Sequence, residues 1–110
     1  MKHEILKRGG TTIVVFKGEI DLESSPAARK ILLKCFENTG NVVVDLSGVT
    51  YIDSSGVASL VEALQAAKKR GSQFSLAAVS EPTRRVLELA RLDQVFTLHD
   101  SVDKALNNPA

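Results

Sequence analysis

The chain has 110 residues, of which 44% are hydrophobic and 25% are charged, and its 14 basic and 13 acidic side chains leave a formal net charge of +1. This length and composition fit one soluble globular domain with its own core. The balanced charge and an aromatic content of 5% without Trp argue against a nucleic-acid-binding surface. A single cysteine, Cys35, excludes an internal disulfide and a CxxC motif.

The sequence contains neither a membrane span nor a signal core. No apolar run approaches the ~20 residues that a transmembrane helix needs, and residues 1–10 lack the apolar stretch of a secretory signal. We therefore expect a cytoplasmic protein.

The first two strands are predicted at residues 3–7 and 11–17, with a turn at residues 8–10 between them. Gly9 and Gly10 supply the positive φ values that a tight hairpin turn requires. Residues 12–16 are apolar on both faces, so the second strand is predicted to be central in its sheet.

Residues 18–23 are expected to form a loop that leads into the first helix. Ser24 or Ser25 can cap this helix, and Pro26 suits its first turn because that position needs no amide donor. Residues 38–40 are expected to end the helix, with the glycine in a left-handed conformation. One apolar stripe with spacings of three and four marks its buried face: Ala28, Ile31, Leu32, Cys35 and Phe36. Cys35 is therefore expected to pack as a small hydrophobic residue.

The stretch from residue 41 to residue 71 contains the residues of most functional interest. Residues 41–46 predict a buried strand, residues 47–54 a loop, and residues 55–70 a second helix that Gly71 ends. The apolar face of this helix is formed by Val57, Leu60, Val61, Leu64 and Ala67.

The remaining residues predict two further strands and two further helices. We expect a strand at residues 74–79, a helix from residue 80 to about residue 91, and a short strand at residues 95–98. Asp100 and Ser101 then cap a last helix that ends at Leu106, and residues 107–110 form a frayed tail. The third helix is expected to bury Val86, Leu87 and Ala90.

The predicted order is β-β-α-β-α-β-α-β-α within one α/β domain at residues 1–106. Strands that alternate with helices require crossover connections, so the sheet is expected to be largely parallel. We expect a mixed sheet of about five strands that begins with one antiparallel hairpin and is covered by about four helices.

Ligand sites in such sheets gather beyond the carboxyl ends of the strands. Glu19 and Asp21 follow the second strand, and Asp53 precedes the second helix, so two acidic loops are expected to meet there. Ser54 and Ser55 lie in or beside the first turn of that helix, where unpaired amides and the helix dipole stabilise an anion. A phosphate on Ser55 is therefore expected to be stabilised by the start of this helix.

Such a phosphate brings about −1.5 to −2 charges and three acceptor oxygens, which would change the surface that a partner protein contacts. The same residues also have a purely structural interpretation. Asp53 and the serines can cap the helix at roughly 1 kcal/mol, Gly56 can allow close packing, and Asp21 can be an ordinary loop carboxylate. These residues alone leave the choice open.

Three segments together resemble the STAS domain family, which includes anti-sigma factor antagonists and the cytoplasmic domains of sulphate transporters. They are GEID at residues 18–21, VVVDLSGV at residues 42–49 and YIDSSGV at residues 51–57. Each is weak by itself, but the ordered set is specific, and the resemblance extends from about residue 3 to residue 106.

The resemblance implies a binding protein that sequesters an anti-sigma factor and so frees a sigma factor. The anti-sigma factor is commonly a serine kinase of the histidine-kinase-like ATPase type, and it phosphorylates the second serine of the motif, here Ser55. A separate serine phosphatase restores binding. The implied partner surface consists of Glu19, Asp21, Asp53, Ser54, Ser55 and Gly56. No catalytic residue, cofactor or metal, and no direct nucleic-acid contact, is expected.

Two other kinds of protein fit the residues less well. A receiver domain, with Asp45 as its phosphoacceptor, would need a pair of acidic residues after the first strand, and this chain has none there. A serine hydrolase would need a histidine base, but His3 and His99 lie near the chain ends, in expected strand-edge or surface positions. A STAS subunit of an ABC-type lipid-transport complex, again a non-enzymatic regulatory module, remains an alternative.

Overall fold

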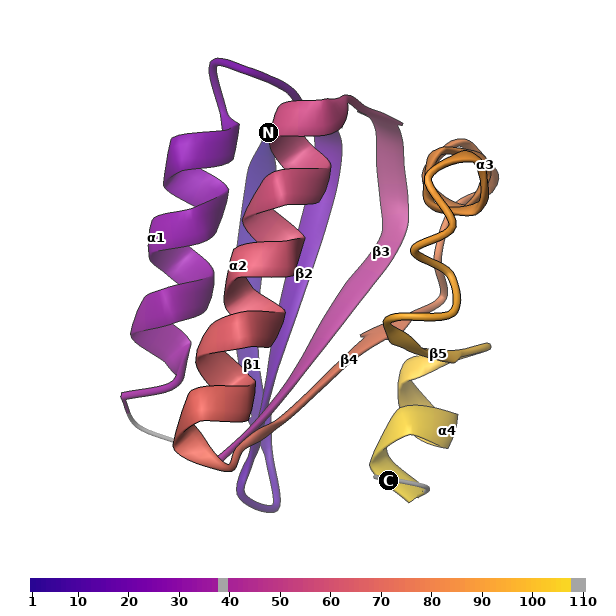
Figure 1. The fold of residues 1–110 in the computed structure, drawn as a ribbon. Coiled ribbons are helices and arrows are strands. Elements are labelled where there is room, and N and C mark those ends of the chain that lie inside the picture. Colours follow the sequence, from indigo (N-terminus) through magenta and orange to yellow (C-terminus); the bar gives the residue numbers. More distant parts are fainter. Residues whose placement is uncertain (38–39, 108–110) are drawn as a thin grey trace.

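The chain folds into one twisted β-sheet with helices on both faces (Figure 1). The computed structural model describes residues 1–37 and 40–107. The strands are β1 (Lys2–Arg8), β2 (Thr11–Ile20), β3 (Asn41–Ile52), β4 (Gln73–Ala77) and β5 (Thr97–His99). The helices are α1 (Ser25–Cys35), α2 (Ser54–Arg70), α3 (Glu81–Leu89) and α4 (Val102–Asn107). None of the helices in this described part combines the length and hydrophobicity needed to cross a bilayer.

The strands lie in the sheet in the order in which they occur in the chain. β1 pairs antiparallel with β2, and each later neighbouring pair is parallel. The predicted element order, the single antiparallel hairpin and the central position of the second strand are therefore confirmed. The hairpin turn has φ values of 53° at Gly9 and 85° at Gly10, as the adjacent glycines predict.

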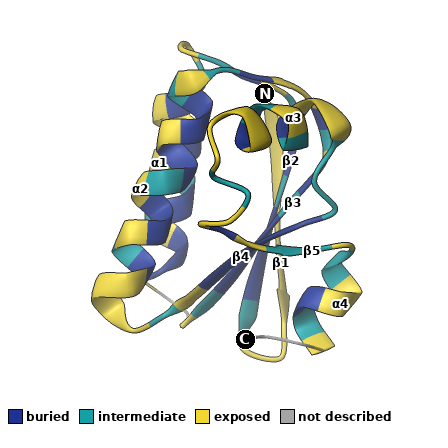
Figure 2. Ribbon diagram, turned by 45° about the vertical axis from the view of Figure 1, so that its right-hand side comes forward, coloured by how far each residue is buried: buried dark blue, intermediate teal, exposed yellow. Residues whose placement is uncertain are grey.

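Alternate residues of the central strands face two different layers. α1 and α2 lie side by side on one face, where Val14, Val44 and Leu76 join the main core. The neighbouring residues Ile13 and Val43 face the other side and pack with α4 (Figure 1). The central strands, covered on both faces, are mostly buried, whereas β1 is exposed along its whole length (Figure 2).

Both strands that lead to the site are longer than predicted. β2 continues to Ile20 and β3 to Ile52, so the prediction of loops is wrong for residues 18–20 and 47–52. Two register shifts between the strands explain the error, since they leave extra residues in β3. The shifts interrupt the alternation that a sequence pattern can detect, but Val49 and Ile52 still reach the core.

The first helix starts as predicted but ends earlier. α1 buries Ala28, Leu32 and Cys35, as its apolar stripe predicts. It ends at Cys35, with Phe36 as its cap. Asn38 and Thr39, expected at this end, lie outside the described residues.

The second and last helices have the predicted caps. Gly71 ends α2 in a left-handed conformation with φ 68°. At the start of α4 the Ser101 hydroxyl accepts a hydrogen bond of 3.1 Å from the Lys104 amide. Asn107, expected in the tail, is the last residue of α4, and residues 108–110 lie outside the described part of the chain.

Three expectations for the second half of the chain need correction. β4 ends at Ala77 rather than at residue 79, because Ala78 has a φ of 51° and leaves the extended conformation. α3 ends at Leu89, so Ala90, expected to be buried, is exposed. β5 occupies Thr97–His99 rather than residues 95–98.

Truncation of Leu60 tests the packing of α2 on the sheet. Its side chain is fully buried, so Leu60→Ala should lower the free energy of unfolding by about 2–5 kcal/mol. The matched control is Leu89→Ala, because Leu89 is 82% exposed and its truncation should change stability by no more than about 0.5 kcal/mol. Urea denaturation of both variants measures the difference, and equal losses would contradict the assigned core.

Candidate functional site

The predicted site residues gather where β2 and β3 end at the same edge of the sheet (Figure 1). In the shared register Glu19 lies beside Tyr51, and Ile20 beside Ile52. β3 then leads into α2 through Asp53 alone, and the Asp53 amide donates a hydrogen bond of 3.3 Å to the Ile20 carbonyl. The helix start is thereby tied to the end of the neighbouring strand.

The Asp53 carboxylate joins three segments of the chain. Its Oδ1 accepts hydrogen bonds from the amides of Ser55, at 2.9 Å, and Gly56, at 3.0 Å, and so caps α2. Its Oδ2 accepts a bond of 3.2 Å from the Leu22 amide in the turn after β2. The capping interpretation of Asp53 is therefore confirmed, and the two acidic loops meet through this residue.

This cap corrects the expectation that unpaired amides await an anion beside Ser55. The amides of Ser55 and Gly56 are already occupied by a carboxylate from the same chain. A phosphate on Ser55 would gain little from these two donors and would instead add charge beside Asp53. The chemical effect of modification here is accumulation of negative charge.

Asp21 organises the turn that Asp53 contacts. Its Oδ1 accepts hydrogen bonds from the amides of Ser24, at 3.0 Å, and Glu23, at 3.1 Å, and from the Ser24 hydroxyl at 3.1 Å. The bonds from the Ser24 amide and hydroxyl hold the pKa of the Asp21 carboxyl below its ordinary value of 3.8. Ser24 therefore occupies the N-cap position of α1, as one of the two predicted residues, but its hydroxyl serves this turn and makes no capping bond to the helix.

Gly56 is required by the close approach of α2 to β2 and β3. A Cβ at this position would press on the Ile20 carbonyl oxygen and lie 2.6 Å from Ile52 Cγ1. Gly56 is buried and offers no side chain to a partner, so its contribution to the site is to let the helix start lie directly on the strands.

The two serines differ in their surroundings. Ser54 is exposed, whereas Ser55 is half-buried and lines an open groove of about 280 Å³ between α1 and α2. Across this groove Arg29 Nε lies 3.3 Å from Glu62 Oε2. Ser55 is thus one of the residues that line this surface recess.

Two exposed apolar side chains flank the acidic residues and were missed by the sequence reasoning. Leu22 is 72% exposed in the turn after β2, and Tyr51 is 50% exposed near the end of β3. Large apolar side chains exposed beside a polar cluster are typical of protein contact surfaces. The position of Leu22 between Asp21 and Glu23 was a usable signal, but the exposure of Tyr51 depends on the register of β3.

The residues of the competing interpretations lie elsewhere. Asp45 lies in the middle of β3, and its Oδ1 accepts a hydrogen bond of 2.9 Å from the Ser47 amide, so it is not at the strand ends. His3 and His99 lie in the edge strands β1 and β5, as expected, and neither approaches Ser55 as a base would.

Comparisons with known proteins agree on one family. The family model described as the STAS domain matches residues 2–105. The anti-sigma-B factor antagonist of Bacillus subtilis is 30% identical over 81 residues, which are 74% of each chain. The solved anti-sigma factor antagonist of Mycobacterium paratuberculosis is 27% identical with a TM-score of 0.80, over 96% of this chain and 91% of that one.

A solved structure of the phosphorylated form of a Bacillus protein also has this fold. It is the cell fate determinant SpoIIAA, with a TM-score of 0.76 over 99% of this chain and 100% of that one. Its identity of 14% makes it evidence for the fold alone.

The hydrogen bonds of Asp21 predict a pH-dependent contribution to stability. Because its pKa is lower in the folded state, the ionised carboxyl stabilises the fold above the ordinary value of 3.8, and this contribution is lost as pH falls through the folded pKa. Asp21→Asn should therefore melt below wild type at neutral pH and approach wild type in acid. Thermal melts over this pH range would measure it, and a constant difference would contradict the assignment.

Proposed function

We propose that this chain, which belongs to the STAS domain family, is an anti-sigma factor antagonist whose binding is switched off by phosphorylation of Ser55. The antagonists of this family are binding proteins rather than enzymes, and their partner is an anti-sigma factor. The observation that carries the proposal is the position of Ser55, which lines a surface groove in the first turn of α2, directly after the Asp53 cap. The proposed functional unit is residues 1–106, acting in the cytoplasm.

The docking surface that we propose combines charge with apolar contact area. Glu19, Asp21 and Ser54 contribute polar groups at the ends of β2 and β3, and Leu22 and Tyr51 contribute exposed apolar area. Asp53 and Gly56 shape this surface from below, through the helix cap and the close approach of α2. A few large side chains commonly supply most of the binding energy of such an interface.

The switch follows from the charge arrangement around Ser55. A phosphate adds about −1.5 to −2 charges, next to the Asp53 carboxylate that already occupies the first-turn amides. In the groove the cation Arg29 is already paired with Glu62. The new charge would therefore act mainly on the partner, by repulsion and by bulk, while the helix remains in place.

The proposed modifying enzymes are a serine kinase and a serine phosphatase. The kinase is the anti-sigma factor itself, of the histidine-kinase-like ATPase type, so that one docking event both sequesters it and presents Ser55 to its nucleotide. The phosphatase removes the phosphate and restores binding.

Substitution of Ser55 tests the switch. Ser55→Asp should weaken binding of the cognate anti-sigma factor by about tenfold or more, because it places a fixed like charge at the interface. Ser55→Ala should bind as wild type but remain bound after incubation with kinase and ATP. Calorimetry measures the affinities, and mass spectrometry identifies the phosphorylated residue.

Ser54→Ala is the control for the acceptor, one residue away at the helix start, and this variant should still be phosphorylated at Ser55. Phosphate on Ser54 would reassign the acceptor, and an unmodified chain with an active kinase would refute the mechanism.

The apolar part of the surface is tested separately. Leu22→Ala and Tyr51→Ala should each weaken binding of the anti-sigma factor by roughly tenfold. Truncation of an important interface residue typically costs more than about 1 kcal/mol of binding free energy, and about 1.4 kcal/mol corresponds to a factor of ten. Their melting temperatures should stay near wild type because both side chains are exposed. Leu89→Ala, exposed on α3, should alter neither property. Full affinity in both variants would remove Leu22 and Tyr51 from the interface.

A further inference from the structure

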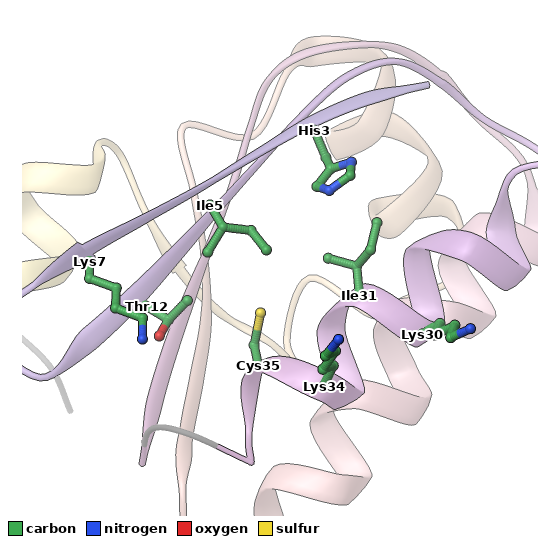
Figure 3. A pocket seen from close by; sticks show the side chains of 8 residues that line it. All are labelled: His3, Ile5, Lys7, Thr12, Lys30, Ile31, Lys34 and Cys35. Carbon is green, nitrogen blue, oxygen red and sulfur yellow. The ribbon is translucent and has the colours of Figure 1, made fainter.

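A second recess lies away from the Ser55 groove, between the edge strand β1 and the helix α1 (Figure 3). Its volume is about 360 Å³, within the range of small-molecule sites. α1 contributes to both recesses, since its first half lines the Ser55 groove and its second half lines this one. None of the residues assigned to the proposed docking surface lines it.

The recess exists because β1 extends beyond the cover of α1. Strand pairing places Ile5 beside Val14 and Lys7 beside Thr12, so these β1 side chains face the same side of the sheet as α1. Val14 is fully buried under the helix layer, but Ile5 remains 47% exposed. Apolar surface at this edge of the sheet is therefore left partly uncovered.

The inner wall of the recess is apolar. Ile5 from β1 and Ile31 and Cys35 from α1 point into the space between strand and helix (Figure 3). Cys35 is buried, and this burial raises the pKa of its thiol, against a smaller opposing effect of the Lys7 charge. The thiol is thus neutral near pH 7 and adds to the apolar wall.

The rim of the recess is cationic. Lys7, Lys30 and Lys34 line it together with His3, and no carboxylate is among the lining residues. Within residues 1–37 and 40–107, none of the three lysines makes an ion pair. In Figure 3 the Lys30 amine points away along the helix, which leaves Lys7 and Lys34 closer to the apolar wall.

We propose that this recess binds a free single-chain anionic amphiphile, with a carboxylate or phosphate head and a medium-length hydrocarbon chain. The chain would cover Ile5, Ile31 and Cys35, and the head would lie near the ammonium groups of Lys7 and Lys34. Burial of apolar surface supplies the larger part of the affinity, and the lysines select the sign of the head group. This inference does not depend on the proposed function at Ser55.

The test uses Cys35, the only cysteine of the chain, as a reporter. Decanoate and decyl phosphate should each slow the reaction of Cys35 with a thiol reagent and shift the methyl resonances of Ile5 and Ile31. Decyltrimethylammonium has the same chain with a cationic head and should bind several-fold more weakly. Equal effects of cation and anions would overturn the proposal, because they would indicate unspecific hydrophobic contact.

Two substitutions on opposite faces of β1 provide a matched pair. Ile5→Glu places a like charge in the recess and should weaken decanoate binding by about tenfold or more. Leu6→Glu, at a residue of similar exposure on the other face, should leave binding unchanged. Both sites are exposed, so both variants should fold. Equal losses in the two variants would overturn the proposed location.

The charged rim is tested by Lys7→Gln and Lys34→Gln. Each should weaken binding of decanoate roughly two- to fivefold, as expected for partly solvated charge pairs. Wild-type affinity in both variants would overturn the role of the lysines. Binding to anionic vesicles without binding of free decanoate or decyl phosphate would overturn the choice of ligand and indicate a membrane-surface contact.

Discussion

The Asp53 carboxylate is the contact on which the candidate site depends. One of its oxygens caps α2, and the other holds the turn that follows β2. Helix caps contribute about 1 kcal/mol each, so this residue matters less for total stability than for geometry. A second bond, from the Asp53 amide to the Ile20 carbonyl at the end of β2, ties the start of α2 to the neighbouring strand.

The same cap bears on the switch that we propose for Ser55. Gly56 lets α2 begin directly against β2 and β3, and Asp53 occupies the amides that would otherwise neutralise an added anion. In the mechanism that we propose, modification of Ser55 in these surroundings would change charge rather than fold. The site therefore suits a protein that presents one of two surfaces to a partner, as we propose for this STAS domain.

Sequence reasoning succeeded where a local pattern has a local cause. Gly9, Gly10 and Gly71 have the positive φ values that a hairpin turn and a helix end require, and most residues of the apolar stripes of α1 and α2 are buried. Sequence reasoning failed where pairing with a neighbouring strand decides the conformation of a segment. The register shifts between β2 and β3 extend both strands through segments that read as loops.

The amino-acid sequence by itself determined the order of the elements, the largely parallel sheet and the ordered motifs that mark the family. Only the tertiary structure decided that Asp53 binds the Leu22 amide, 31 residues away, that Tyr51 faces solvent, and that an apolar recess opens between β1 and α1. The reason is physical: side-chain periodicity reports the conformation of one segment. The contacts between segments depend on strand register and on how far each helix covers the sheet, and neither leaves a periodic signal.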